Sequence, residues 1–576
     1  RADGVELEQR MIASMNEQEE IMGLKPVPHF QPHDGIEEYM DDGNFYDDIT
    51  GELLPRDLVI AARKLEMDFF RQRIVYDKVL IGEARAKTGK APIAVKWIDI
   101  NKGDSKNPDV RSRLVAKEFN KYKDNELYAA TPPLEALRLL ISEAATVRPK
   151  TGKLKLLFVD ARRAYFNAES TRLTYVELPA EDAKEGYCGR LNKCMCGTRD
   201  AATRWGRTYT RDLLSLGFKQ GRASSCCFLH EARSIKCVVH GDDFAFLGND
   251  INLDWIEKEI AKKFEIKVRG RLGNGNKDVQ EMRILNRIVR WSEDCITYEA
   301  DRRHAEIIVQ ELGLTSANST VSPGEKDRKP EEISPPLDAL RASAYRSRTA
   351  RVNYLAQDQP DLAYACKEAC RDMSSPTVKS WARLKHIARY LAGKPRVLYE
   401  YRMQEAKDID CYVDSDFAGD FTSRKSTSGG CMMRGGHLIK HWCNNQSVIA
   451  LSSGEAELYS IITGTTHAMG MQSIAGDLGI ILQKSILTDA TAAKGICERK
   501  GLGEVRHLAV SDLWIQDKVR SGEVKIYKVL GAQNPADMLT KHVEGHKLAA
   551  HSATICTRPG QGRASSAPLT ASMQDS

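Results

Sequence analysis

The sequence predicts a multidomain protein that combines α/β and α+β architecture. The chain has 576 residues, whereas one domain usually takes roughly 150, so three or four domains are expected. Short apolar strand patterns alternate with amphipathic helical patterns through the first half of the chain. A second alternation of strands and helices begins near Asp410, after a region of mainly helical spacing.

Composition narrows the class of protein. Apolar residues make up 42% and charged residues 28% of the chain, as in soluble globular proteins. No run approaches the ~18 apolar residues of a membrane span, so no membrane partner is expected. The fourteen cysteines lack paired CxxC or zinc-finger spacing, which favours reduced, buried thiols in an intracellular protein.

Charge is distributed unevenly along the chain. Residues 1–60 contain fifteen Asp and Glu against four Lys and Arg, a net charge of −11. The whole chain carries +6, which leaves +17 on the remainder. A basic body behind an acidic leader suits a polyanionic partner such as nucleic acid, although a merely soluble surface explains the charge equally well.

The first half of the chain is expected to start with an acidic arm over residues 1–57, where turn formers and acids replace any apolar period. A helix is predicted over 58–79, because its apolar residues share a face: Ile60, Leu65, Phe69 and Ile74. The next expected elements are strands at 91–100 and from Val110, a helix at 134–147, a strand ending after Asp160, a strand at 174–179, a helix at 199–218, a hairpin at 234–248 and a helix at 253–266.

The second half is expected to begin after a linker over 319–339, which is rich in Pro, Ser and mixed charge. Two helical segments follow it. From Asp410 to about Leu548, strands alternate with helices. The last stretch, 549–576, has low complexity and is expected to be disordered.

Carboxylates follow two strands of the first half. Asp160 comes after an apolar strand, and Asp242 and Asp243 lie at the bend of the hairpin. If the strands are neighbours, three crowded carboxylates require a cation, and oxygen ligands suit Mg²⁺ completed by substrate phosphates. Two such ions could activate a 3′-hydroxyl and stabilise a leaving pyrophosphate. For the paired aspartates alone, a solvated turn is the simpler explanation.

Several segments around these acids resemble the reverse transcriptase of copia-type LTR retrotransposons. In family order they are "RSRLVAKEF", "VDARRAYFNAE", "YVELP", "GTRDAATRW", "LLSLGFK" and "HGDD". The resemblance continues through "YRSRTARVNYLAQDQPDLAYACK" and "ARLKHIARYLAG" and covers roughly residues 58–548. It implies a right-hand polymerase with fingers, palm and thumb, which uses Mg²⁺, or Mn²⁺ in its place.

The resemblance assigns roles to individual residues of the polymerase half. Asp160 and Asp242 would be the direct metal ligands, and Asp243 the weaker one. Arg113 and Lys117 would meet the incoming triphosphate, unless they form a solvated strand face. Tyr165 would exclude a 2′-hydroxyl by its size, unless it is ordinary core.

The polymerase half also departs from the family at two positions. His240 stands where the family usually has Tyr before the paired acids, and it titrates near pH 6.5. The segment Asp200–Ala202 stands where the family usually has Gln-Ala-Pro. If that Gln contacts template or nucleotide, Asp200 would repel phosphate instead, and activity would be altered or lost.

A second set of acids lies in the C-terminal half. Asp414 ends a strand, Glu457 lies on a helix, Asp489 ends another strand, and Asp537 precedes the final helix. On a mixed sheet with helices, these four acids can converge on two Mg²⁺ ions. Their segments "YVDSDFAGD", "QSVIALSSGEAELYS", "TDATAA" and "ADMLTK" resemble the ribonuclease H domain of the same elements. That motif favours Glu457 over the neighbouring Glu455 as a ligand.

The loop "VRHLAVSD" is the third departure, because the acid that usually follows its histidine by two residues is Ala509 here. His507 would assist product release or simply order the loop. The resemblance implies seven segments: an arm at 1–57, fingers and palm at 58–250, a thumb-like region at 251–318, a linker at 319–339, connection helices at 340–405, a ribonuclease H-like domain at 408–548 and a disordered tail at 549–576.

The implied function is an RNA-directed DNA polymerase with ribonuclease H. Its partners would be an RNA template, a DNA primer, deoxynucleoside triphosphates and an RNA–DNA hybrid. Integrase, protease and capsid segments would be further partners after processing of a longer polyprotein, whose carboxyl-terminal polymerase portion this chain resembles. The cytoplasm, within a virus-like particle, is the expected location, with the nucleus as a second one.

A catalytically impaired remnant that only binds nucleic acid is the alternative. His240, Asp200 and Ala509 favour the remnant, whereas the retention of all seven acids favours an enzyme. A polymerase that copies DNA is a third reading, but it has no obvious use for the ribonuclease-like half.

Overall fold

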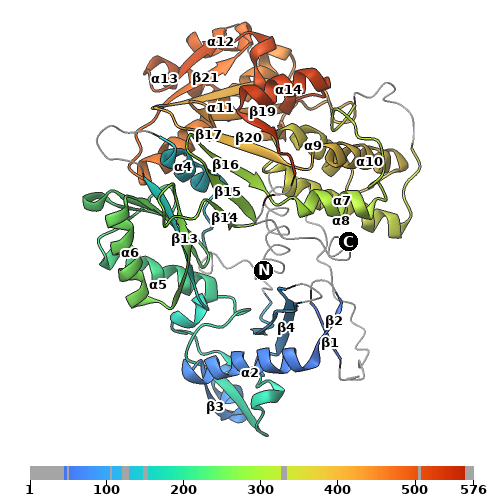
Figure 1. The fold of residues 1–576 in the computed structure, drawn as a ribbon. Coiled ribbons are helices and arrows are strands. Elements are labelled where there is room, and N and C mark those ends of the chain that lie inside the picture. Colours follow the sequence, from blue (N-terminus) through green and yellow to red (C-terminus); the bar gives the residue numbers. More distant parts are fainter. Residues whose placement is uncertain are drawn as a thin grey trace.

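The computed structural model describes residues 44–48, 51–103, 107–119, 129–146, 154–325, 334–503, 508–562 and 564. Most of the acidic arm, His507 and the end of the expected tail lie outside these residues. The N-terminal and C-terminal domains lie at opposite ends of the molecule, blue and orange-red in Figure 1. Among the described helices, none combines the length and the apolar content that crossing a bilayer requires.

The fingers are formed by small sheets and one long helix. α2 (Arg56–Gln72) packs against the hairpin of β4 (Val95–Asn101) and β5 (Val110–Ala116). The remaining elements are the pair β1 (Phe45–Tyr46) and β2 (Leu53–Leu54), helix α3 (Ile81–Thr88), and a three-stranded sheet of β3 (Tyr76–Leu80), β8 (Tyr187–Leu191) and β7 (Tyr175–Val176).

The helix predicted over 58–79 is shorter than expected, because α2 ends at Gln72 and the chain continues as β3. Ile74 has a φ of +50°, which a helix does not allow. Val75 is fully buried, and its carbonyl accepts hydrogen bonds from the backbone N–H groups of Asn192 and Lys193. The pairing partner β8 is distant in sequence, so local helical spacing could not reveal it.

The palm is a six-stranded sheet in the order β13-β6-β12-β11-β10-β9. Helices cover both of its faces. Leu157 and Val159 of β6 pack on the side of α5 and α6, and Leu156 and Phe158 pack on the side of α4. Burial on both faces explains the continuous apolar run before Asp160. The bounds are β6 Lys155–Ala161, β9 Lys219–Gln220, β10 Cys227–His230, β11 Ile235–His240, β12 Asp243–Gly248, β13 Ile266–Leu272, α4 Leu134–Ala144, α5 Ala201–Ser215 and α6 Asp250–Lys263.

The structure divides the expected thumb-like region among three units. α6 and β13 belong to the palm, and α7 (Arg303–Glu311) packs with the helices that follow. β14, β15 and β16 lie between these parts of the chain and form a five-stranded sheet with two later strands, in the order β14-β15-β16-β17-β23. Its strands are β14 Glu281–Ile284, β15 Arg287–Trp291, β16 Cys295–Ala300, β17 Val397–Arg402 and β23 Thr557–Pro559, and the helices are α8 Ala339–Ala356, α9 Ala363–Arg371 and α10 Val378–Gly393.

The expectation of a disordered tail from residue 549 is wrong for its first part. α14 (Gly545–Thr554) continues past that residue, and β23 pairs with β17, with Val397 opposite Pro559. Arg396 also donates hydrogen bonds to the carbonyls of Gln561 and Gly562. This order comes from backbone pairing with a strand about 160 residues earlier, which the composition of the tail does not indicate.

The C-terminal domain has a five-stranded mixed sheet in the order β20-β19-β18-β21-β22. β18 is antiparallel to β19 and parallel to β21. α11 (Ser453–Asp477) packs across β18, β19 and β21, in agreement with the expected ribonuclease H-like arrangement. The other elements are β18 Asp408–Ser415, β19 Thr427–Arg434, β20 His437–Asn445, β21 Gln483–Thr488, β22 Lys525–Lys528, α12 Thr491–Glu498 and α13 Trp514–Arg520.

α4 connects the palm to the C-terminal domain. Its apolar side chains belong to one hydrophobic core that includes residues of both sheets. Buried Arg434 of β19 forms an ion pair of 2.8 Å with Glu143 of α4. Asp477, the last residue of α11, accepts three hydrogen bonds of 2.8–2.9 Å from the backbone of residues 222–224. These contacts fix the two domains relative to each other.

Candidate active sites

The turn between β11 and β12 is a two-residue connection formed by Gly241 and Asp242. His240 lies opposite Asp243 across the hairpin. Gly241 has a φ of +64°, a conformation that suits glycine at the first central position of a tight hairpin turn. The indole N–H of buried Trp205, on α5, donates a 2.8 Å hydrogen bond to the Gly241 carbonyl. α5 therefore holds the turn in place.

β6 brings a third carboxylate to this turn. Asp243 lies directly opposite Asp160 in antiparallel register, so both side chains lie on the same face of the sheet. The N–H of Ala161 donates a 2.9 Å hydrogen bond to the Asp242 carbonyl. All three aspartates line one cavity of about 1100 Å³. The three acids therefore converge as expected, while the ranking of Asp242 above Asp243 as a ligand stays a prediction.

The three residues expected to contact the nucleotide differ in position. Arg113 lines the cavity, between α2 and the palm sheet. Lys117 is exposed after the end of β5, and Tyr165 is half-buried against core residues that include Trp205. Among the described residues around the cavity, neither Lys117 nor Tyr165 forms part of its wall. Their positions match a solvated strand end and ordinary core packing.

A basic residue that sequence reasoning missed lies between the palm acids. Arg269 comes from β13, and its Nη2 atom lies 2.7 Å from Asp160 Oδ2 and 3.0 Å from Asp243 Oδ1. Burial lowers the pKa of Arg269, but the palm aspartates outweigh this effect and raise it. The guanidinium therefore stays charged and neutralises part of the cluster.

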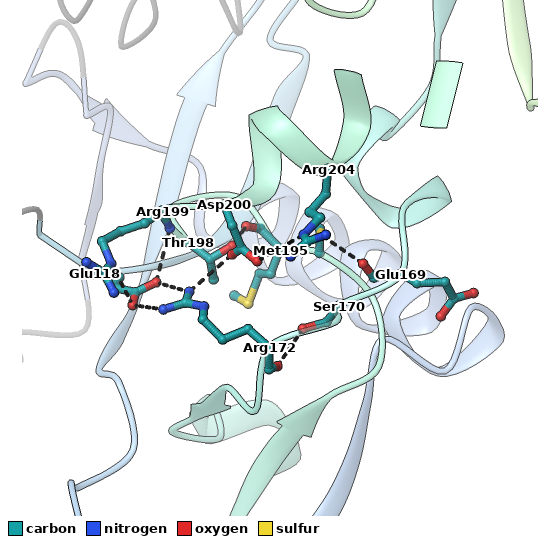
Figure 2. A network of polar contacts seen from close by, with 10 residues as sticks. Glu118, Glu169, Ser170, Arg172, Met195, Thr198, Arg199, Asp200 and Arg204 are labelled. Carbon is teal, nitrogen blue, oxygen red and sulfur yellow. Dashed lines mark hydrogen bonds and ion pairs between the residues drawn. The ribbon is translucent and has the colours of Figure 1, made fainter. Parts of the chain in front are cut away.

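Asp200 belongs to an ion-pair network beside the palm, shown in Figure 2. It is 4% exposed, accepts a 3.1 Å hydrogen bond from Arg172 and lies 3.7 Å from Arg204. Arg172 also donates two 2.6 Å hydrogen bonds to Glu118. Burial raises the pKa of Glu118, but the hydrogen bonds from Arg172 and Arg199 bring it to about 2. The position of Asp200 therefore does not support the expected repulsion of phosphate.

The C-terminal acids form a second cluster. Asp414 at the end of β18, Glu457 on α11 and Asp489 after β21 each offer an oxygen within 4.8 Å of the others. β18 and β21 are parallel neighbours, so their carboxyl ends meet at one edge. Glu455 instead accepts a 2.8 Å hydrogen bond from the backbone of Leu451. The structure thus brings Glu457, rather than Glu455, to the cluster.

Asp537, the fourth expected acid, is linked to Asp414 by the basic residue Lys541. Asp537 lies in η8 (Pro535–Leu539), and Lys541 Nζ is 2.9 Å from Asp537 Oδ1 and 3.7 Å from Asp414 Oδ2. The hydroxyl of Thr540 donates a hydrogen bond to Asp414 Oδ2. Sequence reasoning missed Lys541 and Thr540, although their spacing in "ADMLTK" places both about one helical turn after Asp537.

Burial controls the electrostatics of the C-terminal cluster. It raises the pKa of Asp414 to about 7, against the opposing effect of Lys541. Burial, together with repulsion from Asp414 and Asp489, raises the pKa of Glu457 to about 9. At neutral pH the cluster therefore retains protons, which a divalent cation would have to displace.

Both clusters fit a hard divalent cation in their chemistry, because Mg²⁺ and Mn²⁺ prefer carboxylate oxygens. In the C-terminal cluster, three carboxylates lie together, and burial and mutual repulsion raise the pKa values of Asp414 and Glu457. In the palm, the positive charge of Arg269 neutralises part of the carboxylate charge that a cation would otherwise neutralise.

The loop residue Ala509 is exposed and precedes a short 3₁₀ turn at Val510–Leu513.

Comparisons with known proteins agree on the family. Residues 84–326 match the family model described as reverse transcriptase (RNA-dependent DNA polymerase). The Pol polyprotein of transposon TNT 1-94 from Nicotiana tabacum is 23% identical over 85% of this chain and 37% of its own length. That of transposon RE2 from Arabidopsis thaliana is 27% identical over 78% of this chain and 31% of its own. The chain thus spans about a third of these relatives.

One solved structure is similar over much of the chain. The foamy viral protease–reverse transcriptase in complex with double-stranded DNA has a TM-score of 0.46 and 9% identity, and the match covers 84% of this chain and 73% of that one. The family model and the sequence relatives, rather than this structure, identify the chain. Residues 84–326 carry a reverse transcriptase domain, and the chain as a whole is similar to the Pol polyproteins of copia-type retrotransposons.

Proposed function

We propose that the chain is an RNA-directed DNA polymerase that also degrades the RNA of its hybrid product. The observation that carries the polymerase proposal is the placement of Asp160 opposite Asp243, at the wall of a cavity that Arg113 also lines. The family match to reverse transcriptases supports the same activity. Template, primer and deoxynucleoside triphosphates are accordingly the proposed substrates.

In the palm, the proposed role of the aspartates is to hold Mg²⁺ against the triphosphate. Arg113 would contact the phosphates, and His240, which also lines the cavity, would lie near the primer end. When bound, Mg²⁺ would favour deprotonation of the attacking oxygen and neutralise charge on the leaving group. The protein's own contribution is then mainly position and charge, which is what phosphoryl transfer requires.

In the C-terminal domain, Asp414, Glu457 and Asp489 are the proposed cation ligands, with Asp537 as the fourth acid. The positive charge of Lys541 would oppose the effect of burial and favour the ionised form of Asp414. The substrate would be the RNA strand of an RNA–DNA hybrid, since duplex shape and 2′-hydroxyls distinguish that strand.

Primer extension tests the polymerase proposal. We expect the wild-type chain with Mg²⁺ to extend oligo(dT) on poly(rA), and Asp160→Asn to abolish extension. Asp517→Asn is the matched control, because Asp517 is an exposed acid on α13. Extension that survives both Asp160→Asn and a combined Asp242→Asn and Asp243→Asn change would sink the palm assignment.

Hybrid cleavage tests the nuclease proposal. Glu457→Gln is expected to abolish it, whereas Glu455→Gln, two residues away on the same helix, should retain it. Equal cleavage by both variants would contradict the assignment. A well-folded wild-type chain that neither extends nor cleaves, yet binds hybrid, would favour the nucleic-acid-binding remnant.

A further inference from the structure

A β-bulge aims Arg269 at the palm acids. β13 pairs with β6 as far as Val159, and then the register shifts so that Gly270, rather than Arg269, lies opposite Phe158. Arg269 is therefore the extra residue of the bulge, a device that often redirects a side chain beside a functional site. Gly270 has a φ of +146°, and a Cβ there would lie 2.8 Å from the side chain of Met282. Glycine is thus needed for this bend.

One nitrogen of Arg269 contacts both facing carboxylates. The distances from Nη2 to Asp160 Oδ2 and Asp243 Oδ1 are 2.7 and 3.0 Å. Nη2 of Arg269 therefore occupies the position between Asp160 and Asp243 that a cation bound by both carboxylates would also occupy. The side chain of Arg269 is 34% exposed, so it can leave this position through rotation of its own bonds, without unfolding of the sheet.

We propose that Arg269 competes with divalent cations for Asp160 and Asp243, and so sets the cation concentration at which the palm becomes loaded. This inference rests on the proposed polymerase function. Coulomb attraction explains the competition, because a guanidinium and a divalent cation seek the same carboxylate oxygens. A displaced Arg269 remains at the wall of the same cavity, where a triphosphate could accept its hydrogen bonds.

Direct cation binding tests the inference without relying on activity. Mn²⁺ bound to the full chain is counted from the loss of the free-ion electron paramagnetic resonance signal. All proteins carry Asp414→Asn, which removes an acid of the second cluster. We expect Arg269→Ala to bind Mn²⁺ about tenfold more tightly, the value of one charged hydrogen bond at a partly exposed site. Arg269→Lys should fall between wild type and Arg269→Ala, since lysine keeps the charge but loses the planar fork.

Arg271→Ala is the matched control. It removes an equal charge two residues along β13, from a side chain paired with Asp250 and Asp254 instead. We expect its Mn²⁺ affinity to stay within about twofold of wild type. Equal tightening in Arg271→Ala would indicate a general effect of charge and would overturn the role of Arg269.

Two further outcomes would also overturn the inference. One is an unchanged or weaker Mn²⁺ affinity in both Arg269→Ala and Arg269→Gln, verified as folded by circular dichroism. The other is tightening that persists when Asp160→Asn is added, because the ion would then lie elsewhere. If Arg269→Ala binds Mn²⁺ more tightly but the wild-type chain extends no primer, the competition would stand and the proposed polymerase function would be wrong. Failure of the inference and failure of the proposed function are therefore distinguishable.

Discussion

The two acid clusters of this chain offer the same kind of ligand but balance their charge differently. In the palm, Asp160 and Asp243 are 22% and 19% exposed and share the guanidinium of Arg269. In the C-terminal domain, Asp414 is 4% exposed, and burial raises its pKa to about 7. The charge of an open cluster can thus be balanced by a neighbouring basic side chain, whereas a buried cluster retains protons until a cation replaces them.

Separate inactivation of the clusters is the largest expected effect. Asp160→Asn should lower primer extension at least ~100-fold and leave hybrid cleavage intact, and Asp414→Asn should do the reverse. A change next to a metal ligand already costs 10–100-fold, so loss of a ligand should cost no less. Steady-state rates of both reactions on the same preparations measure this. Parallel loss of both activities would indicate that the two clusters do not act independently.

The pH dependence of stability should distinguish the clusters next. The pKa values of Asp414 and Glu457 are raised from 3.8 and 4.5 to about 7 and about 9. Between those limits the folded chain binds more protons than the unfolded chain. Their stabilising contribution is therefore complete below pH 4 and is lost as pH rises through 7 to 9.

Without divalent cations, thermal unfolding should accordingly show a loss on the order of 8 kcal/mol between pH 5 and pH 9, since each pKa unit corresponds to ~1.4 kcal/mol. Saturating Mg²⁺ should recover most of it, because a bound cation replaces the protons. Asp414→Asn should make the profile less steep between pH 5 and pH 7, whereas Asp160→Asn should not. A flat profile in the wild-type chain would mean that the C-terminal cluster is not buried as described.

A smaller effect is expected from Asp200→Asn, which tests whether Arg172 and Arg204 balance the charge of this buried acid in the polymerase half. Asp200→Asn should destabilise the chain by ~1–3 kcal/mol, since it leaves Arg172 and Arg204 short of a charged partner. The KM for deoxynucleotides should be unchanged, because Asp200 lies outside the cavity wall. Chemical denaturation and nucleotide titration measure the two quantities. A lower KM in the variant would restore the idea that Asp200 repels phosphate.

The smallest expected effect concerns Lys541. Its charge lowers the pKa of Asp414, so Lys541→Met should move the acidic limb of the cleavage pH profile upward by about one unit. Lys547→Met, an exposed lysine on α14, is the control. A profile that does not move, with full activity, would show that Lys541 does not act on Asp414.

Local patterns in the sequence predicted much of the fold and of both acid clusters. The strand before Asp160, the hairpin around Gly241 and the helix of Glu457 follow from apolar period and turn residues, which act over a few neighbours. The end of α2 and the strand β23 could not be predicted in this way. Both depend on backbone pairing with strands that are distant in the sequence.

The sequence by itself determined which acids the chain carries, in which order, and that residues 84–326 match the reverse transcriptase family. Tertiary structure decided how their charge is balanced. Arg269 reaches the palm acids through a bulge in a strand paired with β6, and burial raises the pKa values of Asp414 and Glu457 in the second cluster. Exposure and long-range distances set electrostatic energies, and neither quantity can be read from neighbouring residues in the chain.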